Sequence, residues 1–284
     1  MQTDQIVKLD REHPDFPARA LEISPPILSL DVHGQKDLLS RPCVAFVGSR
    51  RCTEYGKRMT FSLVEQLVAA GITIVSGLAY GIDSHAHRAA IEAGGKTIAV
   101  LASGIKAPLP TWQANLTQDI LQSGGLVISE QPATKPALPH HFLLRNRIIA
   151  GLALGTVVVE AAHKSGALVT ANYALEANRT VFAVPGDTER LTSVGANRLI
   201  RQGAVLVRSG RDILQELDPQ LPGQAQSLFK LEEELLQRAR KPQSMKDLMT
   251  AIKLEQKDLV PLLTRLELDG SLVQQLDGKY VTAM

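Results

Sequence analysis

Between residues 43 and 207 the chain alternates short, continuous apolar runs with longer stretches of helical periodicity. The apolar runs are rich in Val, Ile and Ala, and they are continuous rather than alternating. Continuous runs of this length are typical of strands that are buried on both faces of a sheet. The pattern predicts seven strands, at 43–48, 72–76, 97–102, 126–129, 156–160, 180–184 and 204–207.

Helical patterns fill the intervals between these runs. They predict helices at 56–70, 82–93, 112–123, 142–154, 167–178 and 195–202. Regular strand–helix alternation predicts an α/β fold with a mostly parallel sheet and helices on both faces. In sheets of this kind the functional site usually lies at the carboxyl ends of the strands.

The segments that flank this central domain, residues 41–217, have a different character. Residues 1–40 are Pro-rich and poorly periodic, and we expect a lead-in segment that packs on the first strand of the main domain. Residues 218–226 are rich in Pro, Gly and Gln, which is typical of a linker. The main domain is therefore expected to have a separate neighbour on its carboxyl side.

Residues 227–284 show the pattern expected of that small domain. An Asp277-Gly278 pair stands between two short strand-like runs, which indicates a hairpin. Helical patterns precede it at 228–240, 244–251 and 255–269. Three helices followed by a hairpin predict a winged-helix-like domain.

Charge is distributed unevenly along the chain. The formal net charge is only +2, which excludes a uniformly basic nucleic-acid binder. By region it is −3 for residues 1–40, +6 for 41–217 and −1 for 218–284. The positive charge therefore lies in the central domain. Aromatic residues make up only 4% of the chain, which argues against a site built mainly from aromatic stacking platforms.

The two cysteines, Cys43 and Cys52, are too few for a disulfide framework or a thiol-based zinc site. The first sixteen residues lack an apolar signal core. The longest uncharged apolar run, 148–159, is too short to span a bilayer. We therefore expect a cytoplasmic protein with reduced thiols and no membrane partner.

A glycine turn, Gly48-Ser49, follows the first predicted strand, and Arg50 and Arg51 come directly after it. A strand, a glycine turn and a helix N-terminus together form an anion site from backbone N–H groups and the helix dipole. An arginine can add a bidentate phosphate contact. The alternative is a tight turn with two solvated arginines, because the pattern is neither GxGxxG nor a Walker A motif.

The second predicted strand ends in a segment, 76–87, whose small residues allow a ligand to approach the backbone closely. Asp83 lies near the start of the following helix, where a structural capping role is favoured over catalysis. His85 and His87 are two residues apart and point in different directions on a helix, so we expect no shared metal.

Arg145 and Arg147 stand at the start of an apolar helix, and Phe142 comes just before them. Two arginines beside one aromatic ring suit a phosphodiester with a stacked base. The alternative is that one or both arginines pair with neighbouring acidic residues instead.

The fifth predicted strand ends at Glu160, and a hydroxyl- and glycine-containing turn follows it. Lys164, Ser165, Gly166 and Thr170 offer charge and hydrogen-bond donors to an anion. Glu160 is alternatively a general acid or base. No HExxH, GxSxG or P-loop motif occurs. The strand-end turns therefore favour binding of a phosphate-bearing ligand over covalent catalysis.

As an ordered set, these segments resemble the DprA/Smf family of DNA-processing proteins. The resemblance covers roughly residues 13–215, and the set is specific although each stretch alone is weak. The matching stretches are VGSR at 47–50, SGLA at 76–79, GID at 81–83 with His87, RNRIIAGL at 145–152, VEA at 159–161, SGALVTA at 165–171, VPG at 184–186, GAN at 195–197 and Gly203-Ala204.

The resemblance implies an extended Rossmann fold that binds single-stranded DNA without sequence preference. It implies a homodimer that protects incoming single strands in natural transformation and delivers them to the RecA recombinase. It implies neither catalytic turnover nor any cofactor or metal. The family's DNA contacts map to Arg50 and to the segment of Phe142, with the same pocket lined by Gly48, Ser49, Ser165, Gly166 and Thr170.

Two family features differ in this chain. The family's Phe-Pro before the Arg-Asn-Arg element is Phe142-Leu143 here, and Leu109-Pro110 stands where a Tyr-Pro is usual. We expect these changes to affect the local shape of the pocket and to leave the fold intact.

Two other functions are possible from the sequence. One is an enzyme that cleaves the N-glycosidic bond of a nucleotide with Glu160, although Leu152-Ala153-Leu154 replaces the Pro-Gly-Gly run of such enzymes. The other is a winged-helix regulator that reads duplex DNA through residues 255–269. That helix carries Lys257 and Arg265 together with four acidic residues, which makes a poor duplex-reading surface.

Overall fold

The computed structural model describes residues 5–217, 221, 223–268 and 270–283. It divides into two compact units, Met1–Gln220 and Leu221–Met284. Each unit has its own buried apolar cluster. No helix within the described ranges is both long and apolar enough to cross a membrane.

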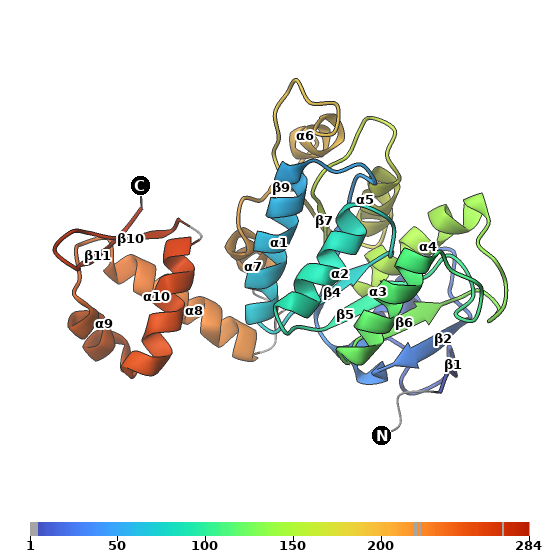
Figure 1. Cartoon of the computed structure of the whole chain (residues 1–284), viewed down its shortest axis with the longest axis horizontal. Coiled ribbons are helices and arrows are strands. Elements are labelled where there is room, and N and C mark those ends of the chain that lie inside the picture. The colour runs from blue at the N-terminus through green and yellow to red at the C-terminus, as the bar shows by residue number, and fades with distance from the viewer. Residues whose placement is uncertain (1–4, 218–220, 222, 269, 284) are drawn as a thin grey trace. The chain divides into compact units, whose positions relative to one another are not determined.

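The first unit is built on a nine-stranded sheet with the order β1-β2-β6-β5-β4-β3-β7-β8-β9 (Figure 1). The seven strands from β3 to β9 run parallel to one another. They confirm the seven strands predicted from the apolar runs, at β3 (Cys43–Val47), β4 (Thr73–Ser76), β5 (Thr97–Val100), β6 (Leu126–Ser129), β7 (Gly155–Val158), β8 (Thr180–Ala183) and β9 (Val205–Leu206).

Helices connect these strands at the positions that periodicity predicted, with ends that differ by at most a few residues. They are α1 (Glu54–Ala69), α2 (Ile82–Glu92), α3 (Thr111–Gln122), α4 (Pro139–Leu152), α5 (Gly166–Glu176) and α6 (Val194–Arg201), and α7 (Gly210–Leu217) follows β9.

Both faces of the sheet are covered. Leu126 and Ile128 of β6 belong to one apolar cluster with α4, α5 and α6, whereas Val127 between them packs with α3 on the other face. A strand that is apolar at every position is the consequence of this two-sided burial.

The order of the strands creates a switch point beside β3. From β3 the chain moves to β4, β5 and β6 on one side, and it then returns to place β7 on the other side. The connections after β3 and β7 therefore diverge to opposite faces of the sheet. In open α/β sheets a ligand crevice lies outside the carboxyl ends of the strands at such a point.

The amino-terminal segment differs from the predicted lead-in. It contains two strands, β1 (Val7–Asp10) and β2 (Ser29–Gly34), and two short 3-10 helices, η1 (Ala18–Glu22) and η2 (Lys36–Ser40). The strand β2 pairs antiparallel with β6, not with the first predicted strand β3. Only alternate residues of β2, Leu30 and Val32, are buried. A strand of six residues with one buried face gives a weak apolar signal between prolines, so the sequence did not reveal it.

The second unit contains three helices and a two-stranded antiparallel sheet, in the order that the sequence predicted. Its core includes Leu235, Leu248, Leu263 and Tyr280. Part of the predicted linker, residues 218–220 and 222, lies outside the described residues. Its end is helical, because α8 already begins at Gly223. The elements are α8 (Gly223–Arg238), α9 (Met245–Ile252), α10 (Gln256–Leu268), β10 (Leu272–Gln274) and β11 (Tyr280–Thr282).

Candidate nucleic-acid interface

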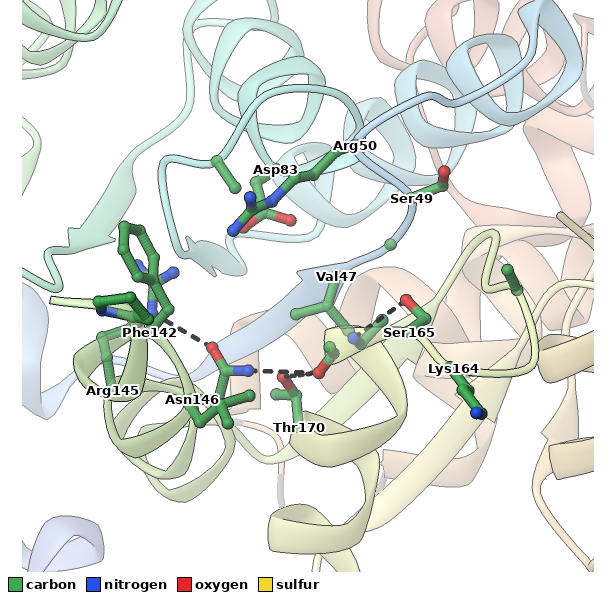
Figure 2. Close-up of a pocket in the computed structure, with 17 residues that line it drawn as sticks. Val47, Ser49, Arg50, Asp83, Phe142, Arg145, Asn146, Lys164, Ser165 and Thr170 are labelled. Carbon is green, nitrogen blue, oxygen red and sulfur yellow. Dashed lines mark hydrogen bonds between the residues drawn. The ribbon is translucent and has the colours of Figure 1, made fainter. Parts of the chain in front are cut away.

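A pocket of about 660 Å³ opens at the carboxyl ends of β3 and β7, at the switch point of the sheet (Figure 2). Three segments supply most of its wall: the turn after β3, the first half of α4, and the turn that leads into α5. The lining residues are Val47, Gly48, Ser49, Arg50, Ala79, Asp83, Pro139, Phe142, Leu143, Arg145, Asn146, Ala162, Lys164, Ser165, Gly166, Ala167 and Thr170.

Backbone contacts fix the turn after β3. The Ser49 N–H donates to the carbonyl of Glu160 at 2.8 Å, and the Ser49 carbonyl accepts from the Ile82 N–H at 3.2 Å. Gly81 has a φ of +90°, and a Cβ there would lie 2.2 Å from the Ser49 carbonyl oxygen. Only glycine satisfies both the backbone angle and the close approach.

Arg50 is the exposed cation that this turn presents to the pocket. Its guanidinium carbon lies 5.5 Å from the centroid of the Phe142 ring, which is cation–π geometry. Arg51 is also exposed, but it is not among the lining residues. Of the two adjacent arginines predicted for the site, the fold therefore brings only Arg50 into the pocket.

Arg145 lines the pocket from below its surface. Its side chain is only 5% exposed, and its Nη1 donates to the carbonyls of Gly77 and Val100 at the ends of β4 and β5. Burial lowers the pKa of Arg145 to about 10, and the nearby carboxylate of Asp83 opposes that shift. Gly77 is required beside it, because a Cβ there would lie 2.5 Å from the guanidinium.

Asp83 is a buried carboxyl that accepts a hydrogen bond from the Gly77 N–H at 3.2 Å. Burial raises the pKa of Asp83, while the charge of Arg145 and the N–H groups of Ala79 and Gly77 act against the rise. These contacts make Asp83 structural, but its partners lie in the loop before α2 and not among the N–H groups of α2 itself, so the capping role favoured from the sequence is corrected.

Arg147 does not reach the pocket. It is two residues beyond Arg145 on α4, so it points to a different side of the helix. Its side chain is 5% exposed and forms an ion pair with Glu130. The alternative reading of the sequence, an arginine paired with a neighbouring acid, therefore describes Arg147, and its placement among the ligand-binding residues is corrected.

The turn into α5 presents the amino end of that helix to the pocket. Ser165 is the N-cap, and its hydroxyl accepts from the Ala167 N–H at 3.3 Å. No acidic residue lies in the first turn of α5, and a Cβ on Gly166 would meet nothing within 4 Å. The end of the helix dipole therefore faces open space, which suits an anion.

The other two predicted residues of this turn differ in their orientation. Thr170 is 1% exposed, and its hydroxyl donates to the Gly166 carbonyl at 3.3 Å. Lys164 is exposed, and its side chain points away from Arg50 and Phe142 (Figure 2). Both line the pocket, but only Lys164 carries a charge that a ligand can reach.

Glu160 lies outside the pocket lining. Its carboxylate accepts from the Thr53 N–H at 2.8 Å, from the Thr53 hydroxyl at 2.7 Å and from the Thr192 hydroxyl at 3.3 Å. The side chain is 2% exposed and sits at the amino end of α1. These contacts hold Glu160 against Thr53, the N-cap residue of α1, and they leave it poorly placed for the general acid–base role considered above.

Asn146 is a pocket residue that the sequence analysis did not select. It lies one turn after Phe142 on α4, and its amide donates to the Gly166 carbonyl at 3.2 Å. Asn146 therefore ties the start of α5 to α4. The i, i+4 spacing from Phe142 was a signal that could have found it, because residues four apart share one face of a helix.

No group of three potential metal-ligating side chains occurs within the described ranges. His87 is fully buried, and its Nδ1 contacts the Thr97 hydroxyl at 2.7 Å.

Both cysteines are free thiols. Burial raises the pKa of the Cys43 thiol to about 12, so it stays protonated.

Taken together, the fold and the site define a doubly wound α/β protein with a pocket at its switch point that is lined by basic side chains and the amino end of a helix. The model of the DNA recombination-mediator protein A family matches residues 8–218. The chain belongs to this family, which is the one that the sequence motifs resemble.

Curated relatives include protein Smf of Escherichia coli, 46% identical over 66% of this chain and 50% of that protein. DNA processing protein DprA of Streptococcus pneumoniae is 45% identical over 65% of each protein. The chain thus matches between half and two thirds of the length of these relatives.

Two solved structures share the fold. DprA from Streptococcus pneumoniae superposes with a TM-score of 0.70 at 39% identity, over 75% of each chain. DprA from Helicobacter pylori, in a study of its single-stranded DNA binding mode, gives a TM-score of 0.69 at 28% identity. This superposition covers 77% of the present chain and 98% of the Helicobacter pylori chain.

Removing one partner of the buried Arg147–Glu130 pair is expected to destabilise the first unit. Arg147→Met should lower its free energy of unfolding by about 3 kcal/mol, because Glu130 is left as an unpaired, largely buried charge. The double variant Arg147→Met with Glu130→Leu should regain most of that loss. Urea unfolding can be followed by the fluorescence of Trp112, the single tryptophan. A single variant as stable as the wild type would show that this pair is not structural.

The buried His87 is expected to make stability depend on pH. Burial and the charge of Arg145 lower the pKa of His87 to about 3. In the unfolded chain this histidine binds a proton near its ordinary pKa of about 6.5. The free energy of unfolding therefore decreases as the pH falls from about 6.5 toward 3. By about pH 5 the loss should be about 2 kcal/mol.

The measurement compares urea unfolding of wild type and His87→Gln between neutral pH and pH 5. The glutamine keeps a polar contact for Thr97 and cannot take up a proton, so the His87 contribution to the pH dependence should vanish. His163→Gln, at an exposed position, is the matched control and should leave that dependence unchanged. Parallel pH profiles for wild type and His87→Gln would contradict the expectation.

Proposed function

We propose that this chain binds single-stranded DNA, without sequence preference, in the pocket at the carboxyl ends of β3 and β7. The observation that carries the proposal is the pairing of an exposed arginine with an aromatic ring beside the amino end of a helix. Arg50 and Phe142 are 5.5 Å apart, and the amino end of α5 is free of carboxylates. Phosphate and base, the two parts of a nucleotide, each have a matching group here.

Electrostatics and family membership support the same proposal. The region 41–217 has a net charge of +6, in a chain whose total is +2. The DprA of Helicobacter pylori, whose structure was studied for its single-stranded DNA binding mode, shares the fold that forms this pocket. A preference for single strands is expected, because the bases of a single strand are free to stack on an aromatic ring, whereas paired bases must first be unstacked.

We further propose that the protein acts in recombination during natural transformation. In this role it protects incoming single strands and loads the RecA recombinase, as a cytoplasmic homodimer without catalytic turnover or a cofactor. Membership of the DNA recombination-mediator protein A family supports this role. The capping contacts of Glu160 support a binding protein over an N-glycosidic enzyme, because they occupy the one strand-end carboxylate considered for that chemistry.

The second unit is proposed to be a winged-helix-like domain with an auxiliary role rather than a reader of duplex DNA. The order of three helices and a hairpin supports the domain type. In α10, Lys257 forms an ion pair with Glu255 at 2.8 Å, and Arg265 pairs with Glu232. Basic side chains that are already paired contribute little to phosphate binding.

Competition between single-stranded and double-stranded DNA for the full chain, at several salt concentrations, tests the proposed function. Single strands should win at every salt concentration, and affinity should fall steeply as salt rises, because phosphate contacts release counterions. A preference for duplex DNA would contradict the proposal.

Arg50→Ala is expected to weaken binding to single strands of any sequence by about tenfold and to lower the salt slope by roughly 0.7, the value for one lost phosphate contact. Arg51→Ala removes the same charge one residue further on, outside the pocket, and is the matched control. It should bind nearly as well as the wild type. Fluorescence anisotropy with oligonucleotides of several sequences measures both quantities. The assignment of the site fails if the two variants behave alike.

A further inference from the structure

An exposed aromatic pair lies next to the pocket but is not part of its lining. Tyr80, in the loop between β4 and α2, is 66% exposed. Its ring meets the ring of Trp112 edge-on, with a centroid separation of 5.5 Å. Trp112 lies in the first turn of α3 and is half-buried. In a chain with few aromatic residues, this pair places the exposed Tyr80 ring in solvent at the edge of the sheet that carries the pocket.

The backbone holds Tyr80 beside the pocket. Its preceding neighbour, Ala79, lines the pocket, and its following neighbour, Gly81, packs against the Ser49 carbonyl. Leu78 has a φ of +53°, a left-handed conformation that is strained for a bulky residue. The side chain of Gln113 donates to the Leu78 carbonyl at 2.8 Å. The loop is therefore tied to both the turn of Arg50 and the start of α3.

Two lysines continue the same edge of the sheet. Lys106 follows β5 and Lys135 follows β6, and both are exposed. Because β4, β5 and β6 are adjacent and parallel, their carboxyl ends lie side by side. The Lys106 N–H donates to the Ala133 carbonyl at 2.7 Å, and the Gly104 N–H donates to the Lys135 carbonyl at 2.8 Å. The two loops are thus joined into one surface.

This surface carries little opposing charge. The segment 101–110 contains no acidic residue, and in 130–138 the only acidic residue is Glu130, which pairs with Arg147. Across the part of the chain that the structure describes, neither lysine forms an ion pair. Both ammonium groups are therefore available to a phosphate.

We propose that a single strand bound at Arg50 and Phe142 continues over Tyr80, where a base stacks on the exposed ring, toward Lys106 and Lys135. This inference rests on the proposed function and extends it from one pocket to a track over three further strand ends. Aromatic faces that alternate with cations suit a single strand, because bases stack while phosphates are neutralised. The edge-on contact with Trp112 steadies the Tyr80 ring and places the only tryptophan where it reports on stacking.

The test measures the affinity of the full chain for oligothymidylates lengthened one nucleotide at a time. Tyr80→Ala should bind the shortest oligonucleotides, which fill only the pocket, as tightly as the wild type does. It should bind longer ones about tenfold more weakly, which corresponds to the loss of one stacked base. Tyr80→Phe keeps the ring and is the control that should retain wild-type affinity at all lengths. Long oligonucleotides, and not short ones, should change the emission of Trp112.

A second arm tests the lysines. The double variant Lys106→Gln with Lys135→Gln should lower the salt slope for long oligonucleotides by roughly 0.7 for each lost phosphate contact. The slope for short oligonucleotides should not change. An unchanged slope for long oligonucleotides would overturn the course toward β6.

The length series separates the track from the pocket. Equal affinity of wild type and Tyr80→Ala at every length would overturn the track, and so would an equal loss at short and long lengths. If the wild type binds no single strand of any length, both the proposed function and the track fail. In the first two cases Arg50→Ala still weakens binding, whereas in the last it has nothing to weaken. Tyr80 is mostly exposed, so the variants are expected to fold, and circular dichroism can verify this.

Discussion

The buried guanidinium of Arg145 holds the functional edge of the first unit together. Its hydrogen bonds to the carbonyls of Gly77 and Val100 join α4 to the ends of β4 and β5, with Asp83 close by as the compensating charge. A charged group at this depth costs several kcal/mol unless it is fully paired. The geometry around it is therefore tightly restricted, down to a glycine at position 77 that leaves room for the side chain.

This arrangement divides the charged residues of the strand ends into two groups. Three of them, Arg145, Arg147 and Glu160, are buried and form hydrogen bonds or ion pairs with neighbouring backbone or side chains. Arg50 and Lys164 stay exposed at the pocket. Burial decides this division, because a paired charge in the interior cannot also serve a ligand. The positive charge at the candidate pocket comes from the cations that are not used in buried structural contacts.

Much of the fold followed from the sequence. The seven parallel strands and six connecting helices were predictable. Burial on both faces gives each strand a continuous apolar run, and each helix repeats its apolar residues with the helical period. The strands β1 and β2 were missed, since a short strand with one buried face between prolines has no comparable signal. The structure brings the turn of Gly48 to Arg50 and the turn of Ser165 and Gly166, both singled out in the sequence, together around one pocket. Asn146 was missed, and Arg147, which was included among the candidate DNA-binding residues, pairs with Glu130 instead.

The sequence by itself determined the class of fold, the family, and the edge of the sheet at which a site should lie, because all three depend on local patterns and ordered motifs. Only the tertiary structure decided which arginine stands exposed at the pocket and which one is buried against the sheet. Arg50 and Arg51 are adjacent in the sequence, and one residue separates Arg145 from Arg147. All four side chains have the same chemistry. What separates them is burial and the direction of each side chain, and both are set by strands and helices far away along the chain.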